Sequence, residues 1–186
     1  NNTNSALLGH SPAQFGKTGF KRRGKPINGW SSADRNSGKE YQQWCESWAK
    51  LTFPIMKEGA SLFVFGARRT LHRAINALED SGFLLKDVLA WKKPSAHHRA
   101  QRFNNVLEKR GLESEMLEWK GWRLGNLAPI YEPIAWFFKP YKITITDNIL
   151  KNGVGAINIE ECKINGVSPT NLLEFGFGKD EVRIHE

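Results

Sequence analysis

Between residues 60 and 91 the hydrophobic pattern changes its period twice, and this succession restricts the fold more than any other feature of the chain. Ala60 to Gly66 is a short run of aromatic and branched residues that predicts a buried strand ending at a glycine. Apolar residues then recur at helical spacing from Leu71 until Gly82, and the segment 83–91 predicts a second strand. Strand, helix and strand within about thirty residues predict a parallel pair joined by a right-handed crossover. We therefore expect an α/β fold.

The segments on either side complete this picture. From Lys39 to just before Gly59, apolar residues at three- and four-residue spacing predict an amphipathic helix. Ile130 to Phe138 is a further strand candidate, in which Pro133 predicts a bulge or an end outside regular pairing. We expect three regions: a basic flexible loop at 1–38, an α/β core at 39–140, and a continuation at 141–186 with a possible target-recognition segment.

Two finer predictions concern the middle of the chain. A charged helix is expected from Arg99 to Arg110, ending at Gly111. Core positions are expected in the segment 83–91 at Leu85, Val88, Leu89 and Trp91.

The charge of the chain favours a polyanionic partner. Lys and Arg number 27 against 19 acidic residues, which gives a formal charge of +8. Cys45 and Cys162 are too far apart in sequence for a zinc ribbon, and the adjacent His97 and His98 would point apart on any regular element, so we expect no metal. No apolar run approaches the roughly 18 residues of a membrane span, so we expect no membrane partner.

Several motifs with known chemistry are missing, but a series of weaker ones remains. The sequence contains no Walker-type phosphate loop, no Gly-x-Gly-x-x-Gly, no His-Glu-x-x-His and no Gly-x-Ser-x-Gly. What it contains, in this order, is a helix with Trp44 and Trp48, the strand Leu62-Phe63-Val64-Phe65-Gly66, a strand ending Trp91-Lys92-Lys93-Pro94, Tyr131-Glu132-Pro133-Ile134 followed by Phe138-Lys139-Pro140, the segment Gly153 to Ile159, and Arg183-Ile184-His185-Glu186.

In this order the segments resemble the amino-methyltransferases that modify adenine or cytosine in DNA, in the arrangement where the catalytic motif precedes the cofactor motif. The resemblance implies a partial Rossmann-like, S-adenosylmethionine-dependent methyltransferase core. It implies transfer of a methyl group to an exocyclic amino group in DNA, adenine rather than cytosine. It also implies a catalytic role for Tyr131, Glu132 and Pro133, and cofactor contacts by His185 and Glu186.

The chemistry of base methylation suggests what two of these residues do. A base whose amino group is to be methylated must leave the duplex and stack in a pocket, and Tyr131 is a candidate wall of that pocket. Glu132 is a candidate for orienting the loop or for contacting the edge of the base. The alternatives are a rim residue of the core for Tyr131 and a solvated carboxylate for Glu132.

Basic residues suited to DNA phosphates occur in three places. One pair follows the first strand, where α/β sheets place ligands, although surface charge at a helix start is the alternative. The densest cationic stretch follows the second strand, and a third group lies in the predicted loop. The candidates are Arg68, Arg69, Lys92, Lys93, His97, His98, Arg99, Arg102, Lys21, Arg22 and Arg23.

The Asp-Pro-Pro-Tyr and Asp-Pro-Phe-x-Gly-x-Gly segments of such enzymes are absent. We therefore expect an internal fragment of a longer cytoplasmic enzyme, bacterial or phage-encoded, from a restriction-modification system with a companion endonuclease as candidate partner. Two other functions stay open. One is a nucleic-acid-binding module or degenerate methyltransferase remnant without catalysis, and the other is an RNA methyltransferase.

Overall fold

A computed structural model describes residues 32–96, 101–125 and 127–174, and the chain divides into two compact units, 1–40 and 41–186. Helix α2 (Ser32–Ile55) begins seven residues before the predicted start at Lys39, so the predicted loop at 1–38 extends too far. The early turns carry weak helix formers such as Ser37 and Gly38, which is why they lack a helical signature in the sequence. No helix among the described residues is long and apolar enough to cross a membrane.

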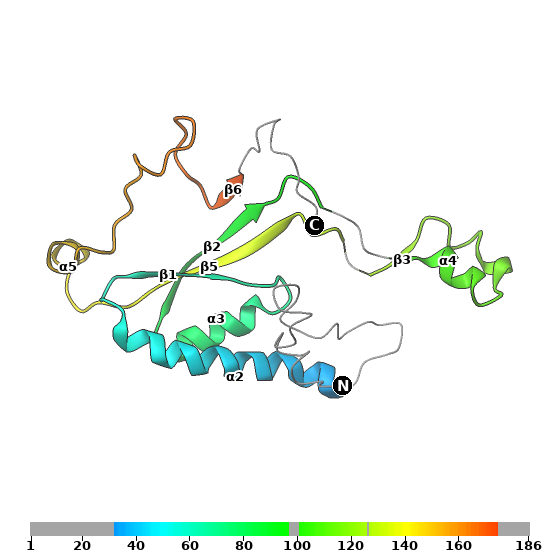
Figure 1. Ribbon diagram of the computed structural model, residues 1–186, viewed down its shortest axis with the longest axis horizontal. Helices are drawn as coiled ribbons and strands as arrows, with labels where there is room; N and C mark the ends of the chain where they lie inside the picture. Colours follow the sequence, from blue (N-terminus) through cyan, green and yellow to red (C-terminus); the bar gives the residue numbers. More distant parts are fainter. Residues whose placement is uncertain (1–31, 97–100, 126, 175–186) are drawn as a thin grey trace, which may run out of the picture. The chain divides into compact units, whose positions relative to one another are not determined.

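The second unit is built on a four-stranded mixed sheet (Figure 1). Its strands are β1 (Ser61–Phe65), β5 (Tyr131–Phe138), β2 (Leu84–Lys92) and β6 (Leu172–Glu174), in that spatial order. Strand β5 is antiparallel to β1 and to β2, whereas β2 and β6 are parallel. Three of these strands and the α/β class agree with the sequence-based predictions.

The predicted parallel pair is wrong in one respect. Strands β1 and β2 run in the same direction, because each is antiparallel to β5, but β5 lies between them. The crossover through α3 (Leu71–Asp80) therefore skips one strand position, which no local pattern reveals. The central position also decides burial: Ala135 and Phe137 of β5 are fully buried, whereas Phe63 of β1 is 51% exposed. The strand predicted to be buried is β1, but the buried one is β5.

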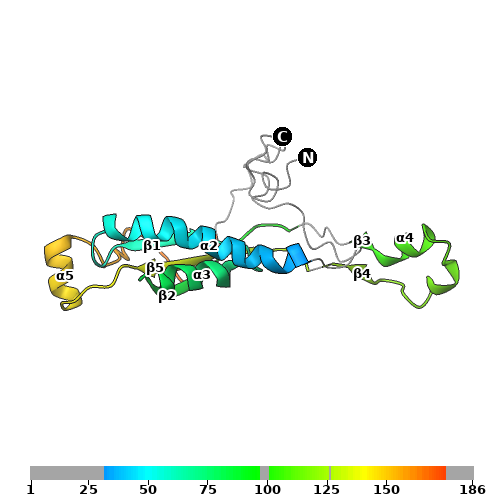
Figure 2. The ribbon, with the colours of Figure 1, turned by 90° about the horizontal axis from the view of Figure 1, so that it is seen from below.

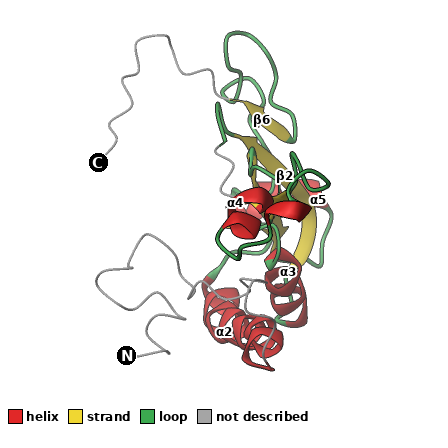
Figure 3. Ribbon diagram, turned by 90° about the vertical axis from the view of Figure 1, so that its right-hand side faces the viewer, coloured by secondary structure: helices red, strands yellow, loops and turns green. Residues whose placement is uncertain are grey.

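One face of the sheet is covered by α3 and by the part of α2 from Tyr41 onward (Figures 2 and 3). Edge-to-face aromatic contacts join the layers, with ring centroids 5.0 Å apart for Phe53 and Phe83 and 6.5 Å apart for Phe83 and Phe137. The buried core consists of Cys45, Ala49, Leu71, Ala74, Ala77, Leu78, Phe83, Ala135 and Phe137.

An irregularity in β2 overturns part of the predicted core. The register between β2 and β5 shifts between Leu85 and Asp87, and a one-residue shift moves the following side chains to the other face. Leu85 packs against the core as predicted, but Leu89 lines a cavity on the opposite face. Val88 is 39% exposed, and Trp91 lies outside the core cluster.

The segment between β2 and β5 forms a small structure of its own. Strands β3 (Gln101–Arg102) and β4 (Arg123–Leu124) pair antiparallel, and between them lie α4 (Phe103–Glu108) and η2 (Glu113–Glu115). Helix α4 is shorter than the helix predicted from Arg99 to Arg110, because residues 101 and 102 are used for strand pairing. Edge-to-face contacts of Phe103 and Trp122 with Trp119 form its aromatic centre.

Helix α5 (Ile145–Asn152) follows β5 and was not predicted. Its buried Asn148 donates hydrogen bonds to the carbonyl oxygens of Glu58 (3.1 Å) and Val154 (3.2 Å), and accepts one from Asn152 (2.8 Å). Gly59 lies directly against the Asn148 amide with φ at +83°, so no larger residue fits this turn between α2 and β1. Asn148 thereby fixes α5 to that turn.

Candidate functional site

One end of the sheet collects the start of β5 and the ends of β1 and β2. Because β5 is antiparallel to both neighbours, Tyr131 pairs with Lys92, and Ile134 pairs with Phe65. The turn after β1 reaches the same place. The structure therefore brings together seven of the residues predicted from three distant parts of the sequence: Arg68, Arg69, Lys92, Lys93, Tyr131, Glu132 and Pro133.

The carboxylate of Glu132 is held by two cations that follow different strands, Arg68 after β1 and Lys93 after β2. Lys93 Nζ lies 2.7 Å from its Oε1, and Arg68 Nη1 lies 3.7 Å from its Oε2. About a third of each side chain is exposed, and pairs in such surroundings contribute only about 0–1 kcal/mol to stability. The two ion pairs of Glu132 therefore fix the positions of these side chains but contribute little to the stability of the fold. Glu132 is not a freely solvated carboxylate, and sequence reasoning missed its pairing with Lys93.

Tyr131 is fixed through its backbone while its ring remains accessible. Arg68 Nη1 donates a hydrogen bond of 2.8 Å to the Tyr131 carbonyl oxygen, and the Lys93 amide donates one of 2.7 Å to the carbonyl of Ile130. The guanidinium carbon of Arg68 lies 5.8 Å from the centroid of the Tyr131 ring, within cation–π range. Tyr131 is 41% exposed and lies outside the core cluster.

An open cleft of about 880 Å³ lies beside this cluster. Its volume is within the range of small-molecule sites, and one side is formed by the turn after β1 while the other is formed by the chain leading into β5. The cleft is thus lined by one aromatic ring, one carboxylate and two guanidinium groups. The lining residues are 67–69, Gly125 and 127–132.

Pro133 lies in regular register opposite Ala90, so the bulge predicted near it is wrong. The Ala90 amide points to β6, where it donates to the Asn171 carbonyl, which leaves Ala90 and Pro133 as a pair without mutual hydrogen bonds. The Pro133 carbonyl faces the other way and accepts from Gly66, just beyond the last paired residue of β1. The missing N–H of proline therefore costs no hydrogen bond between β5 and β2 at this position.

The predicted DNA-contacting cations do not form one described surface. Lys92 is paired with Glu174 at 2.5 Å and Lys93 with Glu132, so both ammonium groups are engaged by carboxylates. Arg69 is exposed beside the cleft, and Arg102 is exposed on β3. The other predicted site residues, Lys21, Arg22, Arg23, His97, His98, Arg99, His185 and Glu186, lie outside the described residues.

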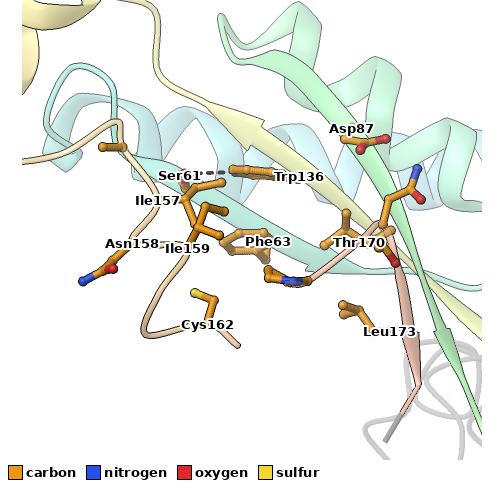
Figure 4. A pocket seen from close by; sticks show the side chains of 14 residues that line it. Ser61, Phe63, Asp87, Trp136, Ile157, Asn158, Ile159, Cys162, Thr170 and Leu173 are labelled. Atoms are coloured by element: carbon orange, nitrogen blue, oxygen red, sulfur yellow. Dashed lines mark hydrogen bonds between the residues drawn. The ribbon is translucent and has the colours of Figure 1, made fainter. Parts of the chain in front are cut away.

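A second cavity, of about 570 Å³, lies on the sheet face opposite the two helices (Figure 4). Its floor is the stacked pair of Phe63 and Trp136, with centroids 5.3 Å apart, and Trp136 Nε1 donates to the Ser61 hydroxyl at 2.9 Å. Ile157 and Leu173 lie around this pair. The sequence pattern missed this cavity, because the bulge that turns part of β2 toward it has no local signal.

The metal and cofactor predictions can be compared with the described residues. In that part of the chain, no group of three or more His, Cys, Asp or Glu side chains could hold a metal ion. Each cavity carries one carboxylate: Glu132 binds the two cations, and Asp87 Oδ1 accepts from the Val88 amide at 2.7 Å. Neither combines a carboxylate with a glycine-rich turn after a strand, the arrangement that commonly binds adenosine cofactors. The described residues alone do not assemble a site that fits S-adenosylmethionine.

Comparison with known proteins gives a clear family match. Residues 11–176 match the N6_N4_Mtase family model, described as a DNA methylase. The chain is 53% identical over 159 residues to the type II methyltransferase M.HindIII of Haemophilus influenzae (strain ATCC 51907 / DSM 11121 / KW20 / Rd). The alignment covers 84% of this chain and 52% of that protein, so the chain spans about half the length of this curated relative.

Two solved structures resemble part of the chain. One is the M1.HpyAVI–SAM complex, with 17% identity and a TM-score of 0.35 over 57% of this chain and 39% of that one. The other is M1.HpyAVI, with 17% identity and a TM-score of 0.34 over 54% of this chain and 40% of that one.

Proposed function

The chain belongs to the N6/N4 family of DNA methylases, and from this premise we propose that the protein methylates DNA at specific sites. The reaction is transfer of a methyl group from S-adenosylmethionine to the exocyclic amino group of a base, adenine in preference to cytosine. The observation that carries the proposal is the 53% identity to a type II methyltransferase over 159 residues. The cofactor supplies the methyl group, and the part derived below is what the residues of this chain do for the base.

The cleft beside Tyr131 is the proposed position of the target base. A base must leave the duplex before its amino group is methylated, and it then needs an aromatic surface to replace the stacking that it loses. The Tyr131 ring is accessible at the cleft and its backbone is fixed from both sides, which suits a wall that must not move. Pro133 fixes its own φ and keeps the preceding residue, Glu132, extended.

Glu132 is proposed to orient this loop rather than to contact the edge of the base. Its two carboxylate oxygens are already engaged by Lys93 and Arg68. A base amino group would have to compete with both cations for the same oxygens.

DNA is the proposed partner, held in part by Arg69 and Arg102, whose side chains are exposed. We also propose phosphate contacts for the basic residues outside the described part, and a contribution of residues 141–186 to target recognition. A companion endonuclease and a cytoplasmic location in a bacterium or a phage-infected cell complete the proposal. They follow from the restriction-modification role of enzymes of this type.

The test uses the protein as its gene encodes it, incubated with S-adenosylmethionine carrying a labelled methyl group and with mixed-sequence DNA. We expect label in double-stranded DNA, recovered mainly as N6-methyladenine after digestion to nucleosides. Recovery as N4-methylcytosine would correct the base, and label in RNA alone would correct the nucleic acid. Salt-dependent DNA binding with no label in any nucleic acid would refute catalysis and leave a binding module.

A further inference from the structure

The contacts of Arg68 suggest a role that family membership does not assign. Arg68 lies in the turn after β1, whereas the residues that it contacts, Tyr131 and Glu132, begin β5. We propose that Arg68 is a positioning residue that holds the Tyr131 ring in the orientation needed to stack a base. This proposal rests on the proposed function.

Three contacts converge on this one guanidinium group. Its Nη1 donates to the Tyr131 carbonyl oxygen at 2.8 Å and lies 3.7 Å from Glu132 Oε2. Its Cζ lies 5.8 Å from the centroid of the Tyr131 ring. A planar guanidinium can bond an acceptor in its plane while its face lies near an aromatic ring, which a lysine ammonium cannot reproduce in one arrangement.

Lys93 completes the arrangement from the opposite neighbour of β5. Its amide donates to the Ile130 carbonyl at 2.7 Å, and its ammonium lies 2.7 Å from Glu132 Oε1. Three consecutive residues, Ile130 to Glu132, are therefore each bonded to a residue that follows β1 or β2. The ring of the middle residue, Tyr131, is open to the cleft.

The exposure of the cluster distinguishes positioning from stabilisation. The Arg68 and Glu132 side chains are 36% and 34% exposed, and ion pairs at such sites add little to folding stability. Removing the guanidinium should therefore leave the fold intact and release the ring. Arg73 is a matched control, because its guanidinium bonds Gln42 Oε1 at 3.2 Å and touches neither Tyr131 nor Glu132 in any described contact.

The first measurement observes the ring directly and requires no catalysis. The protein is labelled with 3-fluorotyrosine, and Tyr131→Phe identifies the Tyr131 signal in the ¹⁹F spectrum, to which this chain contributes three tyrosines. In Arg68→Gln we expect this signal to move and to narrow as the ring gains freedom. Arg73→Gln should leave it in place, and Arg68→Lys should give an intermediate spectrum. An unchanged Tyr131 signal in Arg68→Gln would overturn the proposal.

The second measurement is methyl transfer by the same variants, on the DNA that the unmodified protein methylates best. We expect turnover at saturating DNA to fall by about ten- to a hundredfold in Arg68→Gln, since small misplacements of a reactant cost about that much. The KM for DNA should change less than the turnover, and the melting temperature should stay close to that of Arg73→Gln. Normal turnover in Arg68→Gln would overturn positioning while methylation stands. If the ¹⁹F signal of Tyr131 moves in Arg68→Gln but the unmodified protein methylates no nucleic acid, the positioning of Tyr131 by Arg68 would be supported and the proposed function would be refuted.

Discussion

Replacing Tyr131 by alanine tests whether this ring is a wall for a base or a part of the fold. Tyr131 is 41% exposed, so about three-fifths of the benefit of burying a large side chain is at stake, about 1–2 kcal/mol. Phe137 lies on the same strand and is fully buried, and Phe137→Ala should cost about 3–5 kcal/mol. At about 2–4 °C per kcal/mol for a chain of this size, the melting temperature should fall by about 2–8 °C in the first variant and 6–20 °C in the second.

Activity should follow the opposite order. Loss of one stacked base contact costs about 1–3 kcal/mol, which corresponds to a roughly 5- to 150-fold lower turnover or DNA affinity in Tyr131→Ala. Tyr131→Phe and Tyr131→Trp should retain most of the activity, because any aromatic face can stack. Phe137→Ala should work normally once turnover is divided by the folded fraction.

The assay is thermal unfolding and methyl transfer measured on the same preparations. The reasoning would be refuted if Tyr131→Ala lost as much stability as Phe137→Ala while its folded fraction kept normal turnover. That result would make Tyr131 a core residue, the alternative that the sequence left open.

Three further predictions address stability, pH and DNA binding. Asn148→Ala leaves two partly buried backbone carbonyls without their donor and should cost about 2–4 kcal/mol, measured as a lower urea midpoint. Burial raises the pKa of the Cys45 thiol and of the Tyr41 hydroxyl, so the folded state retains protons that the unfolded chain releases. The contribution of these two groups to stability should therefore be constant below about pH 8.5 and fall above it, and Cys45→Ala should reduce this fall between about pH 8.5 and 10. The same fall in both proteins would contradict the assignment. Arg102→Ala should flatten the plot of log affinity against log salt concentration by about one unit, and an unchanged slope would remove Arg102 from the DNA interface.

Local sequence patterns predicted most of the helices and strands, but not which strands lie next to each other in the sheet. The strands β1, β2 and β5 and helix α3 each carry their own period, which a single sequence displays. The insertion of β5 between β1 and β2 depends on pairing between residues 39 to 77 positions apart, which no local window contains. The bulge after Leu85 follows from that pairing, so the error at Leu89 has the same origin.

Helix α5 was missed although its boundaries are marked. Thr144 accepts a hydrogen bond from the Asp147 amide, and Gly153 ends the helix with φ at +71°. These are an N-cap three residues before an acidic residue and a glycine C-cap, which are readable sequence signals.

The sequence allowed us to predict which residues belong to the candidate site, but not which contacts they make with one another. The order of motifs identified Tyr131 and Glu132, and the strand-end position identified Arg68. That Lys93 bonds Glu132 depends on the register of β2 against β5. Charge density alone cannot tell a solvent-exposed lysine from one already held by a carboxylate.

The central position of β5 also sets an order of events during synthesis. Strands β1 and β2 leave the ribosome first, but they cannot pair with each other, because they stand two strand spacings apart, about 9.5 Å. The sheet can close only after Phe138 has emerged, when β5 enters the gap and forms hydrogen bonds on both edges at once. Until then two strand edges and the apolar faces of α2 and α3 are uncovered, a state in which nascent chains aggregate. The segment 93–130 acts as the tether that delivers β5, so its length should govern the folding rate more than the final stability.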